Sequence, residues 1–352
     1  MAGTDRRGDP SRWAESFRAP ALTGQVSGEV PSFSVIIAAY QAAEFIAEAV
    51  ESVLAQTAPA HEVIVCDDGS TDELERALAP YRDEIVLIRK ERGGAASALN
   101  VAAEAASGDF VAVLDADDAY LPERLEALGG LAAAHPDLDI VTTDALVERD
   151  GRVVGRFNAQ VEFAVDDQRL AILDRCFCAW SAYRRDRLIA AGGYDETLSI
   201  AYDWESALRL IYGGSRAGLV AEPLYRYRLR PASLAANRLA SLAERVDMLA
   251  NVERRQRLSP VELTFLARSL AAQRRSLLLT SAEAALRGGD ADARRRALAV
   301  ARARGVGIRT RIAGAASAAA PRLARRFLER RAQKPGGSRL ERSYPGDEPR
   351  AG

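Results

Sequence analysis

Residues 33–39 read FSVIIAA, and residues 109–115 read DFVAVLD. Both runs are short, apolar and rich in β-branched side chains, which is typical of strands buried on both faces of a parallel sheet. Between and after them the same patterns predict strands over 62–66, 84–89 and 139–143, and helices over 45–54, 72–80, 95–106 and 121–134. Strands that alternate with helices of this length predict an α/β fold.

The alternation becomes less regular after residue 150. The sequence there predicts a hairpin at Gly151, a strand over 176–183, a helix near 203–212, and short strands over 216–221 and 224–229. From about Leu234 onward the sequence predicts helices, with a break at Gly288-Gly289 and with Pro321 at the first position of a helix.

Four regions follow from these patterns. Residues 1–31 and 335–352 are polar and rich in Gly and Pro, so we predict that both are disordered. Residues 32–232 form the predicted α/β domain, and residues 233–334 a helical, Arg-rich region.

The net charge of −1 over 352 residues conceals an uneven distribution. Residues 1–250 carry 25 Lys and Arg against 40 Asp and Glu, whereas residues 251–352 carry 23 against 9. This indicates either an acidic body with a basic tail that meets another partner, or Arg-rich helices that are simply solvated. With two His and three Cys, the chain lacks the residues for a multi-His metal centre or a disulfide scaffold. The odd Cys count and a polar start without an apolar leader predict a cytoplasmic protein.

Carboxylates follow two of the predicted strands. Residues 66–72 read CDDGSTD, and residues 115–118 read DADD. Because side chains alternate along a strand, Asp115 and Asp117 are expected to point the same way and to offer two carboxylates to Mg²⁺ or Mn²⁺. The alternative is a solvated acidic turn.

Asp203 lies at the start of a predicted helix, where the helix dipole favours the carboxylate form that a general base needs. The alternative is a plain helix cap. Trp180, Tyr194 and Trp204 are candidates for stacking on an acceptor sugar, although aromatic residues at this density are also typical of a core.

Eight motifs in register over about residues 33–230 resemble those of the family 2 glycosyltransferases with the GT-A fold. They are FSVIIAAY, SVLAQT, VIVCDDGSTD, RGGAASALN, GDFVAVLDADD, YLPERL, GGYDE and YDWE. The resemblance implies a Rossmann-like mixed sheet with helices on both faces, followed by the C-terminal helical region. It also implies a metal-dependent, inverting transfer of a sugar from a nucleotide-diphosphate donor to an acceptor hydroxyl, in polysaccharide, glycolipid or glycoconjugate synthesis.

The resemblance also implies residue roles. Asp203 would be the catalytic base, Asp115 and Asp117 would bind the metal and the donor diphosphate, and the remaining donor contacts would come from Ala38, Tyr40, Asp68 and Asn100. The chain departs from the family pattern at Tyr202, which replaces a common Glu, and at Leu99, which replaces a common Arg. No His follows His135, so Arg228 or Arg230 is expected to contact the diphosphate in place of the family's frequent His.

Rival functions are less consistent with the sequence. A sugar-nucleotide pyrophosphorylase or a dehydrogenase needs a Gly-rich loop after the first strand, and residues 38–43 contain no glycine. A catalytically silent nucleotide-sugar-binding module remains an alternative.

The C-terminal arginines favour a membrane over a nucleic acid. Residues 321–332 combine arginines on one face with apolar side chains on another, which predicts a peripheral helix on an anionic membrane, near a lipid-linked acceptor. The residues concerned are Arg322, Arg325, Arg326, Arg330 and Arg331, with Leu323, Phe327 and Leu328. The alternative is a solvated helix packed on the catalytic domain. Nucleic-acid binding is not expected, because no aromatic residues are interleaved with the arginines.

Overall fold

The computed structural model describes residues 29–230 and 237–332. The strands are β1 (Phe33–Ala39), β2 (Glu62–Asp67), β3 (Val86–Arg89), β4 (Phe110–Val113), β5 (Ala119–Tyr120), β6 (Ile140–Arg149), β7 (Arg152–Arg156), β8 (Ala182–Arg184) and β9 (Ala217–Leu229). The helices of the first part are α2 (Ile46–Leu54), α3 (Leu74–Leu78), the 3₁₀ helix η2 (Ala79–Tyr81), α4 (Ala95–Ala105), α5 (Arg124–Ala134), α6 (Gln168–Ala171), α7 (Arg185–Ala190) and α8 (Tyr202–Tyr212). The predicted segments 1–31 and 335–352 lie almost wholly outside the described residues.

One mixed sheet organises the first part of the chain. Its strand order is β3-β2-β1-β4-β8-β6-β9-β5, and β7 pairs with β6. β3, β2, β1 and β4 run parallel, whereas β8 is antiparallel to both of its neighbours, β4 and β6. The sheet is therefore parallel at one end and mixed at the other, which confirms the Rossmann-like mixed sheet.

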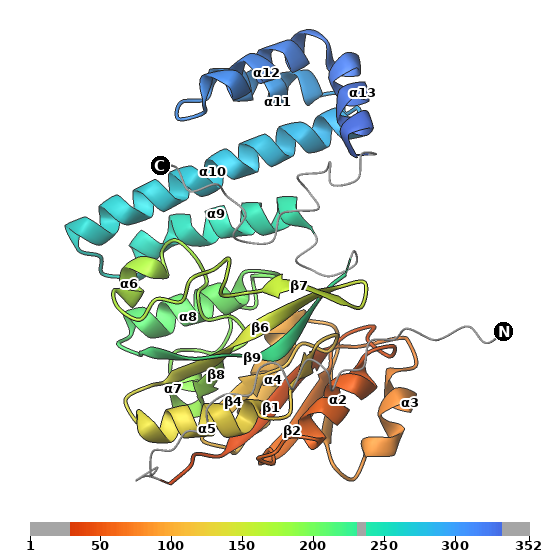
Figure 1. Cartoon of the computed structure of the whole chain (residues 1–352), viewed down its shortest axis with the longest axis vertical. Helices are drawn as coiled ribbons and strands as arrows, with labels where there is room; N and C mark the ends of the chain where they lie inside the picture. The colour runs from red at the N-terminus through yellow and green to blue at the C-terminus, as the bar shows by residue number, and fades with distance from the viewer. Residues whose placement is uncertain (1–28, 231–236, 333–352) are drawn as a thin grey trace, which may run out of the picture.

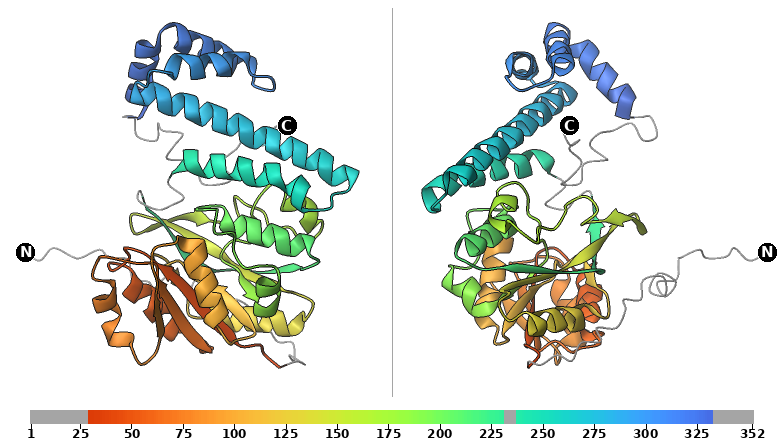
Figure 2. Two further views of the ribbon diagram at one scale, coloured as in Figure 1. Left: turned by 180° about the vertical axis from the view of Figure 1, so that it is seen from behind. Right: turned by 60° about the vertical axis from the view of Figure 1, so that its left-hand side comes forward.

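Helices cover both faces of the sheet, because α2 and α4 lie on opposite sides of it (Figures 1 and 2). In α2, Ile46, Ala49, Val50 and Val53 are buried, as the helical spacing of its apolar residues predicts. β1 is buried along nearly its whole length, as its unbroken apolar sequence predicts.

The C-terminal helices stack beyond the mixed end of the sheet (Figure 1). They are α9 (Arg238–Arg255), α10 (Pro260–Gly288), α11 (Ala293–Arg302), α12 (Ile308–Ala319) and α13 (Pro321–Ala332). Ser259 and Glu262 form a capping box at the start of α10, and Gly289 ends that helix with φ of 72°. No helix within the described residues is long and apolar enough to span a membrane.

Two predicted segments differ from the structure. Residues 176–181 are not a strand, because Trp180 adopts a left-handed conformation with φ of 49° and only residues 182–184 pair in the sheet. The two strands expected over 216–221 and 224–229 are a single strand, β9. Its register with β6 shifts near Pro223, which has no N–H to donate to the ladder.

Candidate active site

The carboxyl ends of the parallel strands meet at one edge of the sheet. Ala39, at the end of β1, lies in register with Asp67, at the end of β2, and β4 ends at Val113, in register with Ile36. In open α/β sheets ligands bind outside this edge. The predicted site residues that follow these strands are therefore brought together.

Asp68 shapes the loop that lies next to the end of β2. Its carboxylate accepts hydrogen bonds from the Lys90 ammonium at 3.0 Å and from the backbone N–H groups of Gly93 and Gly94, each at 2.7 Å. Gly69 has φ of 75°, which the tight turn after Asp68 requires. Asp68 is buried, so in this structure it holds the 90–94 loop in place.

Tyr40 and Arg92 form the exposed border of the same edge. Tyr40 follows β1 and is 42% exposed, and the Arg92 guanidinium lies 3.2 Å from the centre of its ring. Ala38 is partly buried within β1. An exposed aromatic ring with a cation stacked on it suits the flat, polar base of a nucleotide.

Asp115 and Asp117 lie in a turn after β4, not on the strand itself. β4 ends at Val113, and the Asp118 N–H donates to the Asp115 carbonyl at 3.0 Å. The strand alternation from which we expected a shared direction therefore does not apply. Burial, together with the charge of Asp117, raises the pKa of Asp115 to about 7.

The chemistry of this acidic pair fits a divalent cation. Carboxylate oxygens are the ligands that Mg²⁺ prefers, and a bound cation would relieve the repulsion between the two charges. No group of three or more His, Cys, Asp and Glu side chains in residues 29–230 and 237–332 is arranged to hold a metal. The protein would therefore supply two carboxylates and leave the other positions to water and phosphate oxygens, as is usual for Mg²⁺.

Arg228 of β9 and Arg230, which follows that strand, reach the same turn. Arg230 donates from Nε and Nη2 to Asp117 Oδ2 at 2.8 and 2.6 Å. Arg228 donates to the Asp117 carbonyl at 3.2 Å and also binds the Glu48 carboxylate. The two side chains expected to contact a diphosphate therefore lie beside Asp117.

Trp180 forms part of the wall beside Asp115. Its indole N–H donates to Asp115 Oδ2 at 3.1 Å, and its ring stacks on Tyr225 with the ring centres 4.9 Å apart. The buried guanidinium of Arg124 donates to the Trp180 carbonyl. The left-handed backbone of a residue this bulky costs about 1–3 kcal/mol, and such strain is concentrated at functional sites.

Asp203 occupies the first turn of α8, as predicted. The Trp204 N–H donates to Asp203 Oδ1 at 2.7 Å, and burial raises the pKa of the Asp203 carboxyl. Its charge also raises the pKa of Asp115, so the two carboxyl groups share one electrostatic environment. A carboxylate with a raised pKa is a stronger base, which suits proton abstraction from a hydroxyl.

Two of the three acceptor candidates are wrong for this structure. Tyr194 and Trp204 are each 3% exposed, so neither ring can stack on an acceptor. The Trp204 indole N–H donates to the Ile172 carbonyl at 2.6 Å, as in an ordinary core. The side chain of Asn100, expected at the donor, binds the backbone N–H and carbonyl of Tyr194 and the carboxylate of Glu196, and so fixes that turn.

Sequence reasoning missed three residues that build the site. Arg124 is fully buried beneath Trp180, and the Tyr225 hydroxyl donates to the buried Asp118 at 2.9 Å. The sequence could have indicated Arg124, because it is a charged residue on an otherwise apolar helix face. Glu244, from α9, contacts the segment before Asp203, and no local pattern indicates that contact.

Comparisons with known proteins find similarity to glycosyltransferases. Residues 34–189 match the sequence model of the family described as Glycosyl transferase family 2. Chondroitin synthase from Escherichia coli is 29% identical over 187 residues, which cover 51% of this chain and 26% of that protein. The chain spans less than a third of the length of this and several other curated relatives.

Two solved structures share the fold. TarS 1–349 from S. aureus, in complex with UDP-GlcNAc, superposes with a TM-score of 0.57 at 18% identity, covering 81% of this chain and 91% of that one. The mannosyltransferase PcManGT from Pyrobaculum calidifontis, in complex with GDP-Man and Mn²⁺, gives 0.55 at 21% identity, covering 92% and 93%. With the family match, these likenesses identify residues 34–189 as a glycosyltransferase family 2 domain on a GT-A fold.

Proposed function

We propose that the chain is a metal-dependent glycosyltransferase that moves a sugar from a nucleotide-diphosphate donor to an acceptor hydroxyl, with inversion at the anomeric carbon. The observation that carries this proposal is the convergence of Asp203, from α8, with Asp115 and Asp117, from the turn after β4. The charges of Asp117 and Asp203 both raise the pKa of Asp115, so the three carboxyl groups lie within electrostatic reach of one another.

The donor would bind along the carboxyl edge of the sheet. Its base would lie against Tyr40 and the turn that Asp68 holds, next to Ala38 at the end of β1. Its diphosphate would lie near Arg228 and Arg230, whose guanidinium groups supply positive charge. TarS and PcManGT were solved with nucleotide sugars, which supports a donor of this class.

Asp115 and Asp117 would hold the divalent metal together with diphosphate oxygens. When bound, Mg²⁺ or Mn²⁺ offsets the charge that develops on a leaving diphosphate. Arg230 would then leave Asp117 and pair with the diphosphate. The Mn²⁺ in the PcManGT complex supports a metal of this kind.

Asp203 would accept the proton of the acceptor hydroxyl as that oxygen attacks the anomeric carbon. A base on the face opposite the leaving group leads to inversion. Trp180 donates its indole N–H to Asp115 Oδ2, which would keep that carboxylate directed toward the diphosphate.

The acceptor belongs to polysaccharide, glycolipid or glycoconjugate synthesis, and the likeness to chondroitin synthase supports this. Exposed Leu323 and Phe327 on α13 lie among exposed arginines, which would let this helix rest on the anionic inner face of a membrane. That position would bring the enzyme close to a lipid-linked acceptor.

A silent binding module is the second candidate, because the Arg230 pair with Asp117 stabilises the acidic turn without a metal. The deciding experiment measures thermal stabilisation of the full chain by UDP, GDP, dTDP and CDP, each with and without Mn²⁺. An enzyme of the proposed kind gives a shift with one nucleotide that depends on Mn²⁺, followed by turnover of the matching sugar donor. Stabilisation without turnover of any donor would favour the silent module, and no stabilisation by any nucleotide would contradict both.

A further inference from the structure

Glu244, in the second turn of α9, binds the backbone just before α8. Its carboxylate accepts three hydrogen bonds, from the N–H groups of Ser199 at 2.7 Å, Ile200 at 2.6 Å and Ala201 at 2.6 Å. Three consecutive N–H groups that converge on one carboxylate form an anion-binding nest of the kind that fixes a backbone segment. Here the anion comes from a different element, more than 40 residues later in the chain.

The helix that carries Asp203 has no cap of its own. Ala201 is the N-cap residue of α8 and has no side chain that can accept a hydrogen bond, so the start of the helix depends on outside partners. Glu244 provides that partner, and its negative charge lies at the positive end of the helix dipole. Asp203 follows Ala201 by two residues, so the direction of its side chain depends on this contact.

The next residue of α9 meets the other side of the same turn. The Arg245 guanidinium lies 5.6 Å from the centre of the Trp204 ring, and its charge lowers the pKa of Asp203, against the larger effect of burial. Arg245 forms no hydrogen bond or ion pair with any residue that the structure describes. α9 therefore contacts the segments on both sides of Asp203.

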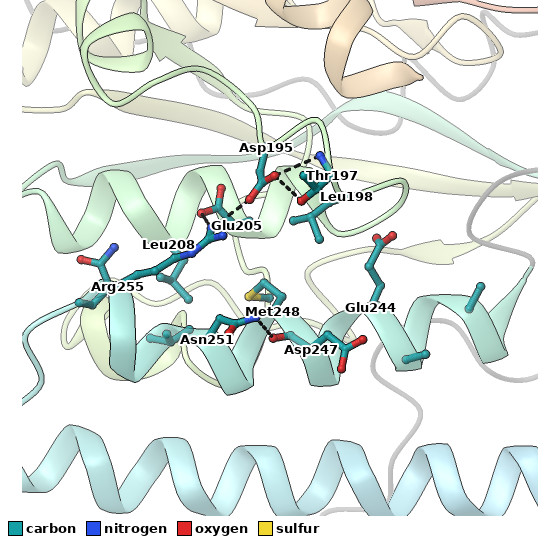
Figure 3. A pocket seen from close by; sticks show the side chains of 14 residues that line it. Asp195, Thr197, Leu198, Glu205, Leu208, Glu244, Asp247, Met248, Asn251 and Arg255 are labelled. Atoms are coloured by element: carbon teal, nitrogen blue, oxygen red, sulfur yellow. Dashed lines mark hydrogen bonds and ion pairs between the residues drawn. The ribbon is translucent and has the colours of Figure 1, made fainter. Parts of the chain in front are cut away.

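A cleft of about 490 Å³ separates the 195–198 segment from α9 (Figure 3). Glu244 and Asp247 both line it and lie one turn apart on the same helix. Asp247 is exposed, and its side chain makes no hydrogen bond within the described residues, whereas Glu244 is half-buried and uses its carboxylate on the 199–201 backbone. Two neighbouring acids of one helix therefore differ in their exposure and in the contact with the start of α8.

We propose that Glu244 is a positioning residue for the catalytic base, so that α9 is part of the catalytic centre rather than an appendage to it. By holding the 199–201 backbone, Glu244 directs Asp203 toward the acceptor hydroxyl. This inference rests on the proposed role of Asp203 as the base. It assigns a catalytic contribution to a helix that lies outside the matched family domain of residues 34–189.

The test compares Glu244→Ala, Glu244→Gln and Asp247→Ala in the full chain, using the donor and metal found by the nucleotide survey. We expect Glu244→Ala to lower kcat about 10- to 100-fold, since a misplacement of about 1 Å can cost roughly 100-fold. The donor KM and the Mn²⁺-dependent stabilisation by the nucleotide are expected to stay within about twofold, since the donor lies at the strand ends. Glu244→Gln retains an acceptor oxygen and is expected to recover most of kcat, whereas Asp247→Ala matches the parent protein.

Hydrogen exchange gives a second measurement on the same proteins. We expect faster exchange of the amides of residues 199–201 in Glu244→Ala, with protection retained in Glu244→Gln. If Glu244→Ala does not fold, Glu244→Asp, which withdraws the carboxylate by one methylene, replaces it in the comparison.

Three results would overturn the positioning role. These are a kcat in folded Glu244→Ala within about twofold of the parent, an equal loss in Asp247→Ala, or a rise in donor KM that accounts for the whole effect. If the parent protein turns over no donor, the proposed function fails and this inference fails with it. If the parent is active and Glu244→Ala is equally active, only the inference fails.

Discussion

Residues 29–230 and residues 237–332 differ in how many charged side chains they bury. The α/β part buries six charged residues to 5% exposure or less, namely Asp67, Asp68, Asp118, Arg124, Asp144 and Glu205. Among the described residues of the helical part, only Glu262 is buried, at 7%. Burying a charge is costly unless it is bound, so a fold retains such groups where they build a site or a junction. The α/β part therefore contains the site, and the one buried charge of the helices marks where they join it.

The contacts of Glu262 support that interpretation. Arg169, in α6, donates from Nε to Glu262 Oε1 at 2.7 Å, and Glu262 also closes the capping box of α10. Together with Glu244, it joins the helices to the α/β part through carboxylates that the helices supply.

Replacement of Asp203, the proposed base, tests whether this half-buried acid performs the chemistry. We expect Asp203→Asn to lower kcat by about 10²–10⁴-fold, the usual contribution of a general base. Stabilisation by the nucleotide and Mn²⁺ is expected to remain, because the donor contacts lie on other segments. Kinetics of sugar transfer measure the first effect and thermal unfolding the second. A loss smaller than tenfold would remove Asp203 from the mechanism.

Adjacent acids in the turn after β4 give a sharper test. We expect Asp117→Asn to abolish the Mn²⁺-dependent shift in unfolding temperature while leaving the metal-free temperature nearly unchanged, because Asp117 is partly exposed and pairs with the side chain of Arg230 at the surface. Asp118→Asn is expected to lower the metal-free unfolding temperature and to keep the Mn²⁺-dependent shift. Asp118 accepts hydrogen bonds from the Tyr225 hydroxyl at 2.9 Å and from the Arg228 N–H at 2.8 Å, and disturbing buried bonds of this kind costs about 1–3 kcal/mol. Equal effects of both variants would mean that the turn is purely structural.

The fold could be predicted where the local pattern determined the structure. The unbroken apolar run of β1 and the helical spacing of α2 are local properties, and both elements form as predicted. The strand expected over 176–183 is mostly absent because Arg124 and Asp115 bind Trp180 from distant parts of the chain. Contacts of this range leave no periodic signal in the sequence.

The same limit applies to the candidate site. Asp203 could be placed in the first turn of a helix from its neighbours alone. Asp115 and Asp117 lie in one turn, and strand alternation is the wrong reason to group them, since β4 stops at Val113. Neither the burial of Tyr194 nor the contact of Glu244 with residues 199–201 could be predicted, because both depend on how α8 packs.

Acid should weaken the junction between the two parts. The Arg169 guanidinium, with the backbone and hydroxyl of Ser259, lowers the pKa of Glu262 from 4.5 to about 2. A carboxyl with a lower pKa in the folded state stabilises it above the unfolded pKa, and that contribution is lost as pH falls from about 4.5 toward 2. We expect a loss on the order of 1–2 kcal/mol, discounted because Arg169 is half-exposed. Urea unfolding between pH 6 and pH 3 measures it, and Glu262→Gln should remove that part of the pH dependence. An unchanged pH dependence in Glu262→Gln would contradict the role of this pair.

The smallest expected effect concerns the far end of the helices, where the structure buries no charged side chain among the residues that it describes. Leu323 and Phe327 on α13 are 65% and 64% exposed, and exposed arginines flank them. Each arginine near an anionic surface contributes about 1 kcal/mol, so we expect Arg326→Gln to weaken binding to phosphatidylserine-containing vesicles about fivefold. Phe327→Ser is expected to weaken it by a similar factor, because it removes apolar surface that would enter the interface. Sedimentation with vesicles measures both, and Arg295→Gln on α11, where Asp292 already pairs the arginine, is the matched control. Two results would mean that these arginines only solvate the helices. One is equal vesicle binding by the parent and both α13 variants, and the other is parent binding to neutral vesicles as strong as its binding to anionic ones.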